Sequence, residues 1–289
     1  MKKIRTVVLA MVLCAVLVAC GANSAAEEST VPLPEQTQQQ ETEPVLAEQI
    51  IYDSDGIRIT VKGMEENTAT GTNIRILVEN GTDRNLAVSG DLFLVNGVTL
   101  PGYLYAQVAA GTRTNDAIEF YTEVLDTAGI RNIGTIRAYD ARIVDTDSYE
   151  ILARVPMELT TAHRGYEDLV AQESGVELYR QEGITVIAQM ISREFYGSTV
   201  QLLVKNETPG DIIVEAENVS VNGYTLDAWL YDAVVKDSVR YCQLDLFETG
   251  LAENGIEQID QVSFRLHFLD AGSYETIARS DVLTVEVMG

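Results

Sequence analysis

The sequence is poor in the residues from which catalytic and metal centres are usually built. It has three cysteines and two histidines, His163 and His267. Neither histidine falls in a zinc motif such as H-E-x-x-H, and the chain has no G-x-S-x-G elbow and no P-loop. We therefore expect no enzymatic activity, no cofactor and no metal ligands, with an enzyme or a metal-dependent module as the less favoured alternative.

Positive charge is also scarce. The chain has 20 Lys and Arg against 44 Asp and Glu, a formal net charge of −24. Nucleic acid is not expected as a partner, because its phosphates require basic side chains. Anionic lipid headgroups would repel such a chain unless a covalent anchor held it there. A solubilising surface explains the acidity most simply, and a cationic partner or divalent cations are the alternatives.

The chain begins with a basic segment followed by an apolar run from Val7 to Val18, which is too short to span a membrane as an ordinary helix. Residues 17–21 then read Leu-Val-Ala-Cys-Gly and closely resemble the lipobox of bacterial lipoproteins. The resemblance implies a signal peptide over residues 1–19 and lipid attachment to the Cys20 thiol. An ordinary signal peptide with a chance cysteine is the alternative.

Cysteine usage fits this interpretation. Cys14 lies in the predicted leader and Cys20 is the predicted anchor, so Cys242 is the only thiol left and an intramolecular disulfide is impossible. Cys242 lies in a strand-like run, and we expect it to be a small core residue.

Residues 20–47 are rich in polar residues and contain Pro32, Pro34 and Pro44. Few large apolar side chains are present, so the segment cannot bury enough surface to order itself. We predict a disordered stalk that joins the anchor to the folded part.

The rest of the chain is an internal duplication. Residues 74–105 aligned without gaps to residues 200–231 share 12 identities in 32 positions, including an Asn-Gly pair at Asn96 and at Asn222. Each copy exceeds 100 residues, which is enough for a core of its own and far longer than a solenoid repeat. We predict one domain over 48–160, a connector over 161–173 with a short helix near 166–171, and a second domain over 174–289.

The patterns within each copy predict strands. Residues 57–62, 74–79 and 262–268 alternate between apolar and polar side chains, and Asn-Gly favours a tight two-residue hairpin. One helical turn is expected over 124–129. Seven or so short strands in about 110 residues predict an all-β fold of two tandem immunoglobulin-like β-sandwich domains. Together with the lipobox, this resembles the surface lipoproteins of Gram-positive, clostridial-type bacteria that carry tandem immunoglobulin-like domains, most of them without an assigned function.

Residues 145–150 place three carboxylates at short spacing, which would suit Ca²⁺. The second copy, residues 270–275, lacks the middle carboxylate and has a glycine, so we favour a hairpin turn as the shared role.

The best candidates for ligand contact are Tyr103 and Tyr105, which correspond to Trp229 and Tyr231 in the second copy. Residues two apart on a strand point to one face. An open face would give a platform for sugars or proteins. A tryptophan in an immunoglobulin-like sandwich is more commonly part of the core, and we expect that here.

The sequence as a whole predicts a lipoprotein on the extracellular face of the cell membrane, anchored through Cys20. Its expected function is a non-catalytic binding module for a protein or a cell-wall glycan. The alternative is a structural spacer or accessory subunit of an envelope complex.

Overall fold

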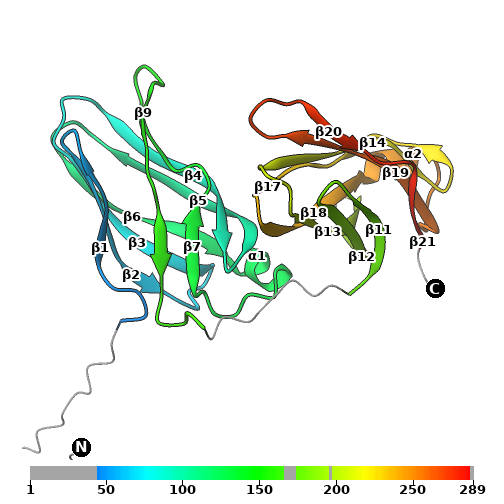
Figure 1. Ribbon diagram of the computed structural model, residues 1–289, viewed down its shortest axis with the longest axis horizontal. Helices are drawn as coiled ribbons and strands as arrows, with labels where there is room; N and C mark the ends of the chain where they lie inside the picture. Colours follow the sequence, from blue (N-terminus) through cyan, green and yellow to red (C-terminus); the bar gives the residue numbers. More distant parts are fainter. Residues whose placement is uncertain (1–43, 166–173, 195–196, 287–289) are drawn as a thin grey trace, which may run out of the picture. The chain divides into compact units, whose positions relative to one another are not determined.

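The computed structural model describes residues 44–165, 174–194 and 197–286, and Figure 1 shows them as coloured ribbon. The predicted leader, the Cys20 anchor, most of the stalk and the predicted helix near 166–171 lie outside the described residues. No helix in the described part is both long and apolar enough to cross a bilayer.

The first half contains ten strands and one short helix. In chain order they are β1 (Gln49–Ser54), β2 (Ile57–Glu65), β3 (Gly71–Asn80), β4 (Leu86–Val95), β5 (Val98–Val108), β6 (Arg113–Tyr121), α1 (Thr122–Thr127), β7 (Thr135–Ala138), β8 (Arg142–Asp145), β9 (Ile151–Arg154) and β10 (Glu158–Thr160). The order β1-β2-β3-β6 forms one antiparallel ladder. A second ladder has β4 between β5 on one edge and β7 and β8 on the other.

The second half repeats this plan. Its elements are β11 (Val176–Gln181), β12 (Ile184–Glu194), β13 (Gly197–Asn206), β14 (Ile212–Val221), β15 (Tyr224–Thr225), β16 (Ala228–Trp229), β17 (Tyr231–Val234), β18 (Ser238–Phe247), α2 (Glu248–Glu253), β19 (Gln261–Asp270), β20 (Thr276–Arg279) and β21 (Leu283–Glu286). One ladder runs β11-β12-β13-β18, and the other is a six-stranded sheet centred on β14 and β19. The predicted all-β sandwich architecture is confirmed.

Alternation along the strands gives each half a core of its own. Phe93 and Phe120 meet edge to face in the first core, with ring centroids 5.2 Å apart. In the second core Tyr179 packs on Phe268 at 5.0 Å. Each buried side chain of this size contributes roughly 1.5–3 kcal/mol. The duplication in the sequence is thus matched by two hydrophobic cores, one in each half.

The two halves also make contacts with each other. Val98 of β5 pairs in parallel with Val239 of β18, and the buried hydroxyls of Thr99 and Ser238 are hydrogen-bonded at 2.7 Å. This pairing and that of Tyr103 with Glu119 link three ladders into one 15-stranded sheet. Residues 43–289 form one compact unit, so the existence of two independent domains stays a prediction.

The Asn-Gly hairpins form as predicted. Asn96 and Gly97 have φ of 50° and 83°, and Asn222 and Gly223 have 49° and 87°. Positive φ at both central residues is the backbone of the two-residue turn that matches strand twist. Each asparagine also accepts hydrogen bonds at its side-chain oxygen from two backbone N–H groups of a later loop, for example those of Gly134 and Thr135.

A second duplicated asparagine lies at the end of β3 and of β13. Asn206 is fully buried; its amide donates to the carbonyls of Gly210 and Val234, each at 2.9 Å, and its oxygen accepts from the backbone and the hydroxyl of Thr208. Asn80 makes the same kind of contacts in the first half. Each of these side chains joins the loop after its own strand to a backbone carbonyl 28 or 29 residues further along the chain.

Two boundaries can be compared with the sequence predictions. The predicted helical turn is present as α1, and Gly129, with φ of 67°, follows its end. The predicted stalk extends too far, however, because Leu46 is only 1% exposed and packs in the first core. The backbone carbonyl of Val45 also accepts from the N–H of Ala162. The packed chain therefore begins a few residues before position 48.

Candidate functional site

The four aromatic side chains singled out in the sequence are all exposed. Trp229 is 60% exposed and Tyr103 is 52% exposed, and Tyr105 and Tyr231 are also open to solvent. The expectation that Trp229 belongs to the core is wrong. Its neighbours Ala228 and Leu230 turn inward, and Trp229 alternates to the other face of its short strand.

Trp229 and Tyr231 form one wall of a groove, which we call the Trp229 groove. Their ring centroids lie 6.3 Å apart. The groove has a volume of about 410 Å³, within the range of small-ligand sites. Its lining consists of Thr99, Leu100, Pro101, Glu123, Val124, Thr127, Ala128, Trp229, Tyr231, Asp232, Arg240, Tyr241, Gln243 and Asp245.

Tyr103 and Tyr105 do not line the Trp229 groove. Both lie on β5, where Tyr103 is paired with Glu119 and the Tyr105 hydroxyl accepts from Gln107 at 3.3 Å. Tyr121, which the sequence did not single out, is a further exposed aromatic on β6 and donates to Glu119. The structure thus brings together one of the two predicted aromatic pairs in a concave site.

The lining of the Trp229 groove includes an ion pair. Arg240 donates to the Asp232 carboxylate and, at 2.7 Å, to the carbonyl of Ala233. Burial raises the pKa of Asp232, and the Arg240 charge acts in the opposite direction. The Nε of Arg240 is buried and, among the described residues, has no hydrogen-bond partner. A buried donor without a partner costs about 1–3 kcal/mol.

These groups determine what the groove can recognise. Two neighbouring aromatic rings provide a stacking surface for an apolar ring face. Asp232, Asp245, Gln243 and Glu123 in its lining offer hydrogen-bond acceptors. Three carboxylates disfavour an anionic ligand, whereas hydroxyl and amine donors fit them.

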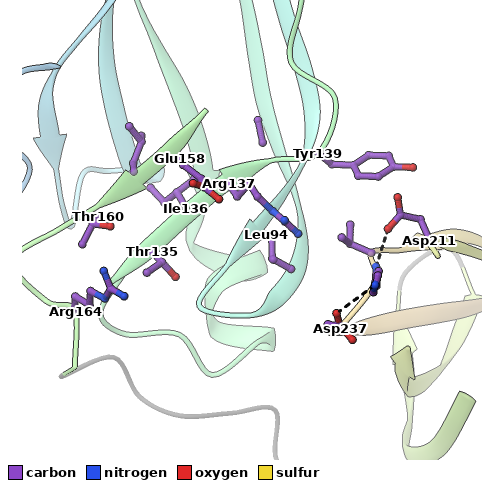
Figure 2. Close-up of a pocket in the computed structure, with 14 residues that line it drawn as sticks. Leu94, Thr135, Ile136, Arg137, Tyr139, Glu158, Thr160, Arg164, Asp211 and Asp237 are labelled. Carbon is purple, nitrogen blue, oxygen red and sulfur yellow. Dashed lines mark hydrogen bonds and ion pairs between the residues drawn. The ribbon is translucent and has the colours of Figure 1, made fainter. Parts of the chain in front are cut away.

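A larger cavity of about 840 Å³ lies at β7 and β10, and Figure 2 shows its lining. Its side chains are mostly polar and charged, among them Arg137, Glu158 and Asp211. Asp211 accepts from the backbone N–H of Lys236 at 2.7 Å. Exposed aromatic side chains do not gather there as they do in the Trp229 groove, and we do not assign the cavity a ligand.

The acidic segment at 145–150 is a turn, as favoured from the sequence. Asp145 Oδ1 accepts from the backbone N–H groups of Asp147 and Ser148 at 2.9 and 3.0 Å, and Asp270 does the same with Gly272 and Ser273. Because these bonds stabilise the charged form, the pKa of both carboxyls is lowered. The carboxylate of Asp145 is used by its own hairpin, which favours the turn over a Ca²⁺ site.

This turn predicts a pH-dependent loss of stability. A lowered pKa in the folded state stabilises the fold above the ordinary carboxyl pKa, and this contribution is lost as the pH falls through the folded value. The double variant Asp145→Asn/Asp270→Asn should therefore unfold at lower denaturant than the wild type at pH 7. The gap should close as the solution is acidified below the folded pKa values. Urea titrations over the acidic range would measure it, with the exposed Asp83→Asn as a control that shows no comparable gap.

One group of metal-ligating side chains is closely gathered in the described part of the chain. It consists of Glu215, Glu217 and His267. His267 was predicted on the polar face of its strand and lies there, yet it is buried by its neighbours. Cys242, by contrast, is a fully buried core residue, as predicted, and burial raises the pKa of its thiol well above the ordinary value.

His267 also joins a hydrogen-bond relay with Glu215 and Thr276. Thr276, His267 and Glu215 are connected in the same order as the nucleophile, the general base and the orienting carboxylate of a catalytic triad. Acyl transfer additionally requires free donors for the oxyanion. Thr276 lies at the start of β20, and its backbone is paired there with Leu269 of β19. We interpret the relay as a device that orients the imidazole.

Comparisons with known proteins leave the family open. The chain matches no protein-family model and no curated protein sequence. A solved structure described as the crystal structure of the conserved domain protein from Bacillus anthracis aligns with 87% of this chain and 94% of its own, at 9% identity and a TM-score of 0.29. That likeness is too weak to carry an argument.

Proposed function

We propose that this protein is an extracellular lipoprotein, anchored through Cys20, whose folded part is a non-catalytic binding module. The observation that carries the proposal is the Trp229 groove. An exposed tryptophan beside an exposed tyrosine is costly to leave in water and gives the protein a concave aromatic surface.

A neutral or amino-substituted glycan is the ligand that we favour. Sugar rings have an apolar face that stacks on aromatic rings, and hydroxyl groups around it that donate to carboxylates. Asp232, Asp245 and Glu123 supply acceptors beside Trp229. A cell-wall glycan would be within reach of a protein held at the outer face of the membrane. A protein ligand, with Trp229 as its anchor residue, is the second candidate.

The test uses the chain from Gly21 to Gly289, which retains every described residue. We expect it to cosediment with purified insoluble cell wall, and Trp229→Ala to weaken the binding at least about tenfold, because truncation of an anchor residue costs about 2 kcal/mol or more. Tyr103→Ala, an exposed aromatic outside the groove, is the matched control and should bind as the wild type does.

Fluorescence of the only tryptophan provides a second readout. Emission from Trp229 should be red-shifted and readily quenched by acrylamide, and soluble wall oligosaccharides should shift it to the blue and protect it. Equal wall binding by Trp229→Ala and the wild type would remove the groove as the site. If neither chain bound wall or soluble fragments, the protein-ligand or spacer alternatives would take precedence.

A further inference from the structure

The outer face of the six-stranded sheet carries a histidine between two glutamates. Glu215 and Glu217 are two residues apart on β14, so both point to the same face. His267 lies directly opposite Glu215 in the register of β19. The three side chains are thus placed by paired strands at the centre of a sheet, where the backbone is more rigid than in a loop.

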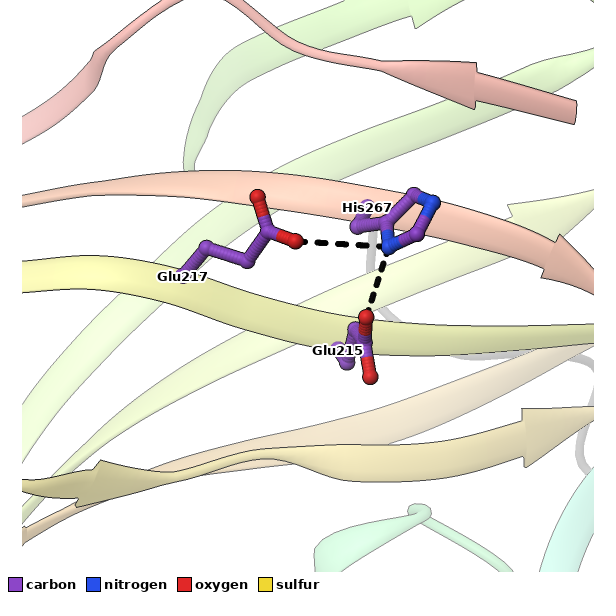
Figure 3. Close-up of side chains that lie close together, drawn as sticks. All are labelled: Glu215, Glu217 and His267. Carbon is purple, nitrogen blue, oxygen red and sulfur yellow. Dashed lines mark hydrogen bonds and ion pairs between the residues drawn. The ribbon is translucent and has the colours of Figure 1, made fainter. Parts of the chain in front are cut away.

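The geometry focuses both carboxylates on one atom. His267 Nδ1 is 2.6 Å from Glu215 Oε1 and 3.4 Å from Glu217 Oε1. Figure 3 shows both carboxylates directed at this nitrogen. The ligand atoms of the three residues lie within 4.8 Å of one another. His267 is 6% exposed, whereas the glutamate side chains are 29% exposed, so the position between them can be reached from solvent.

The other ring nitrogen is also committed. His267 Nε2 is 2.8 Å from the Thr276 hydroxyl. When Nε2–H donates to this hydroxyl, the lone pair of Nδ1 faces two negative carboxylates. That arrangement is repulsive unless a proton or a cation lies between them. Fixing the ring through its second nitrogen is also how proteins orient a histidine that ligates a metal.

We propose that His267, Glu215 and Glu217 form a binding site for a divalent transition-metal ion, with Zn²⁺ as the representative. One imidazole and two carboxylates suit zinc and its first-row neighbours, whereas Mg²⁺ and Ca²⁺ prefer oxygen ligands alone. Three protein ligands would leave the fourth tetrahedral position open toward solvent. The proposal does not depend on the Trp229 groove or on its ligand.

The two distances from Nδ1 can be compared with those around a zinc ion. Ligand atoms about 2.0–2.1 Å from a tetrahedral zinc ion lie about 3.3 Å apart. The 3.4 Å between Nδ1 and Glu217 already has this value. The 2.6 Å between Nδ1 and Glu215 is a hydrogen bond, which lengthens when the metal replaces its proton.

Arg279 competes for these carboxylates, whereas Arg265, which lies opposite Glu217 in the register of β19, donates to the carbonyl of Ser280. The Nη1 of Arg279 donates to both oxygens of Glu217, at 2.7 and 2.6 Å. A glutamate bound to metal through one oxygen can keep Arg279 on the other, which orients the ligand. The arginine charge opposes the metal charge, so we expect micromolar rather than nanomolar affinity.

The first half has no equivalent site. Ser89 occupies the position of Glu215, and Arg142 lies opposite Ser89 where His267 lies opposite Glu215. Arg142 and Arg154 both pair with Asp140 there. The three proposed metal ligands are therefore found together in the second copy and not at the equivalent positions of the first.

The test is a titration of the Gly21–Gly289 chain with zinc chloride, followed by NMR of the histidine ring signals. The chain must carry no histidine tag, because it then contains two histidines only, His163 and His267. We expect the His267 signals to shift and saturate with a single equivalent of zinc, with Nδ1 showing the larger change in ¹⁵N shift. His163, whose Nε2 faces one carboxylate, that of Glu66, should stay unchanged.

Two variants separate this site from zinc bound elsewhere on an acidic surface. Glu217→Gln should weaken zinc binding at His267 at least about tenfold. Glu65→Gln is the matched control, because Glu65 is likewise bonded through both oxygens to one arginine, Arg75, and it should leave the titration unchanged. Backbone amide spectra would verify that both variants fold.

Three outcomes would overturn the proposal. The first is that His267 does not respond to zinc at concentrations up to about 1 mM. The second is that zinc shifts His163 as much as His267. The third is that Glu217→Gln and Glu65→Gln behave alike, in which case the proton and Arg279 are the only cations that this cluster holds.

Discussion

Replacing Asn206 with alanine should destabilise the protein by about 3 kcal/mol, a large fraction of the stability of a typical domain. The substitution removes one buried amide and leaves the carbonyl of Val234 and the N–H of Thr208 without this partner, whereas the carbonyl of Gly210 keeps the hydroxyl of Thr208. Each unpaired buried group costs about 1–3 kcal/mol, and partial relaxation of the loops reduces the sum. Urea denaturation monitored by circular dichroism would measure the loss.

The duplication supplies a companion variant. Asn80→Ala removes the equivalent side-chain hydrogen bonds from the first half and should lower the stability by a similar amount. Asn115→Ala, an exposed position on β6, should change stability by less than about 0.5 kcal/mol. A loss below about 1 kcal/mol for both buried asparagines would contradict the argument from buried hydrogen bonds.

The same pair of variants tests the domain count. If the halves unfold independently, calorimetry should show two transitions, and Asn80→Ala and Asn206→Ala should each lower a different one. A single transition lowered by both variants would mean that the contacts at Thr99 and Ser238 make residues 43–289 one cooperative unit.

Replacing Cys20 with serine should abolish the membrane anchor. Each acyl CH₂ group buried in the bilayer contributes about 0.8 kcal/mol, so loss of the acyl chains that we propose on Cys20 would remove essentially all of the binding energy. The remaining chain is strongly acidic and has no attraction to anionic lipid of its own. We expect the serine variant to lose fatty-acid label and to move from the membrane pellet to the soluble fraction.

Cys14→Ser is the matched control. Cys14 lies in the predicted apolar part of the leader, and its replacement should leave label and membrane binding intact. Intact mass would distinguish a serine variant retained through an uncleaved leader from one that is truly anchored. Fatty-acid labelling of the Cys20→Ser chain would contradict the lipobox assignment.

The fold could be predicted largely because its signals are local and doubled. An Asn-Gly pair favours positive φ at two adjacent residues, and such pairs can be recognised in the sequence at Asn96-Gly97 and Asn222-Gly223. Alternation then assigns an inner and an outer face to each long strand. The sequence does not show that Leu46 is buried, because a single apolar residue in a polar segment has no periodicity from which burial can be inferred. The predicted stalk therefore extends too far.

The candidate sites were harder to predict, because they depend on which strands become neighbours. The spacing of Trp229 and Tyr231 predicted that they share a face, but it did not indicate that this face is exposed. The strands β16 and β17 are too short to show an alternating pattern. Glu215 and His267 are 52 residues apart, and only the register of β14 against β19 places them opposite each other. The spacing Glu215-x-Glu217 with His267 on a polar face was the only available hint.

The buried position of Cys242 makes it a probe of the opening motions of the native protein. If the leader with Cys14 is removed as we propose, and Cys20 carries lipid or is replaced by serine, Cys242 is the single free thiol, and it lies in the second core. A thiol that is sealed from solvent and held protonated reacts only in states that have opened. The rate at which a thiol reagent modifies the native protein therefore counts openings of the second half alone, without any engineered probe.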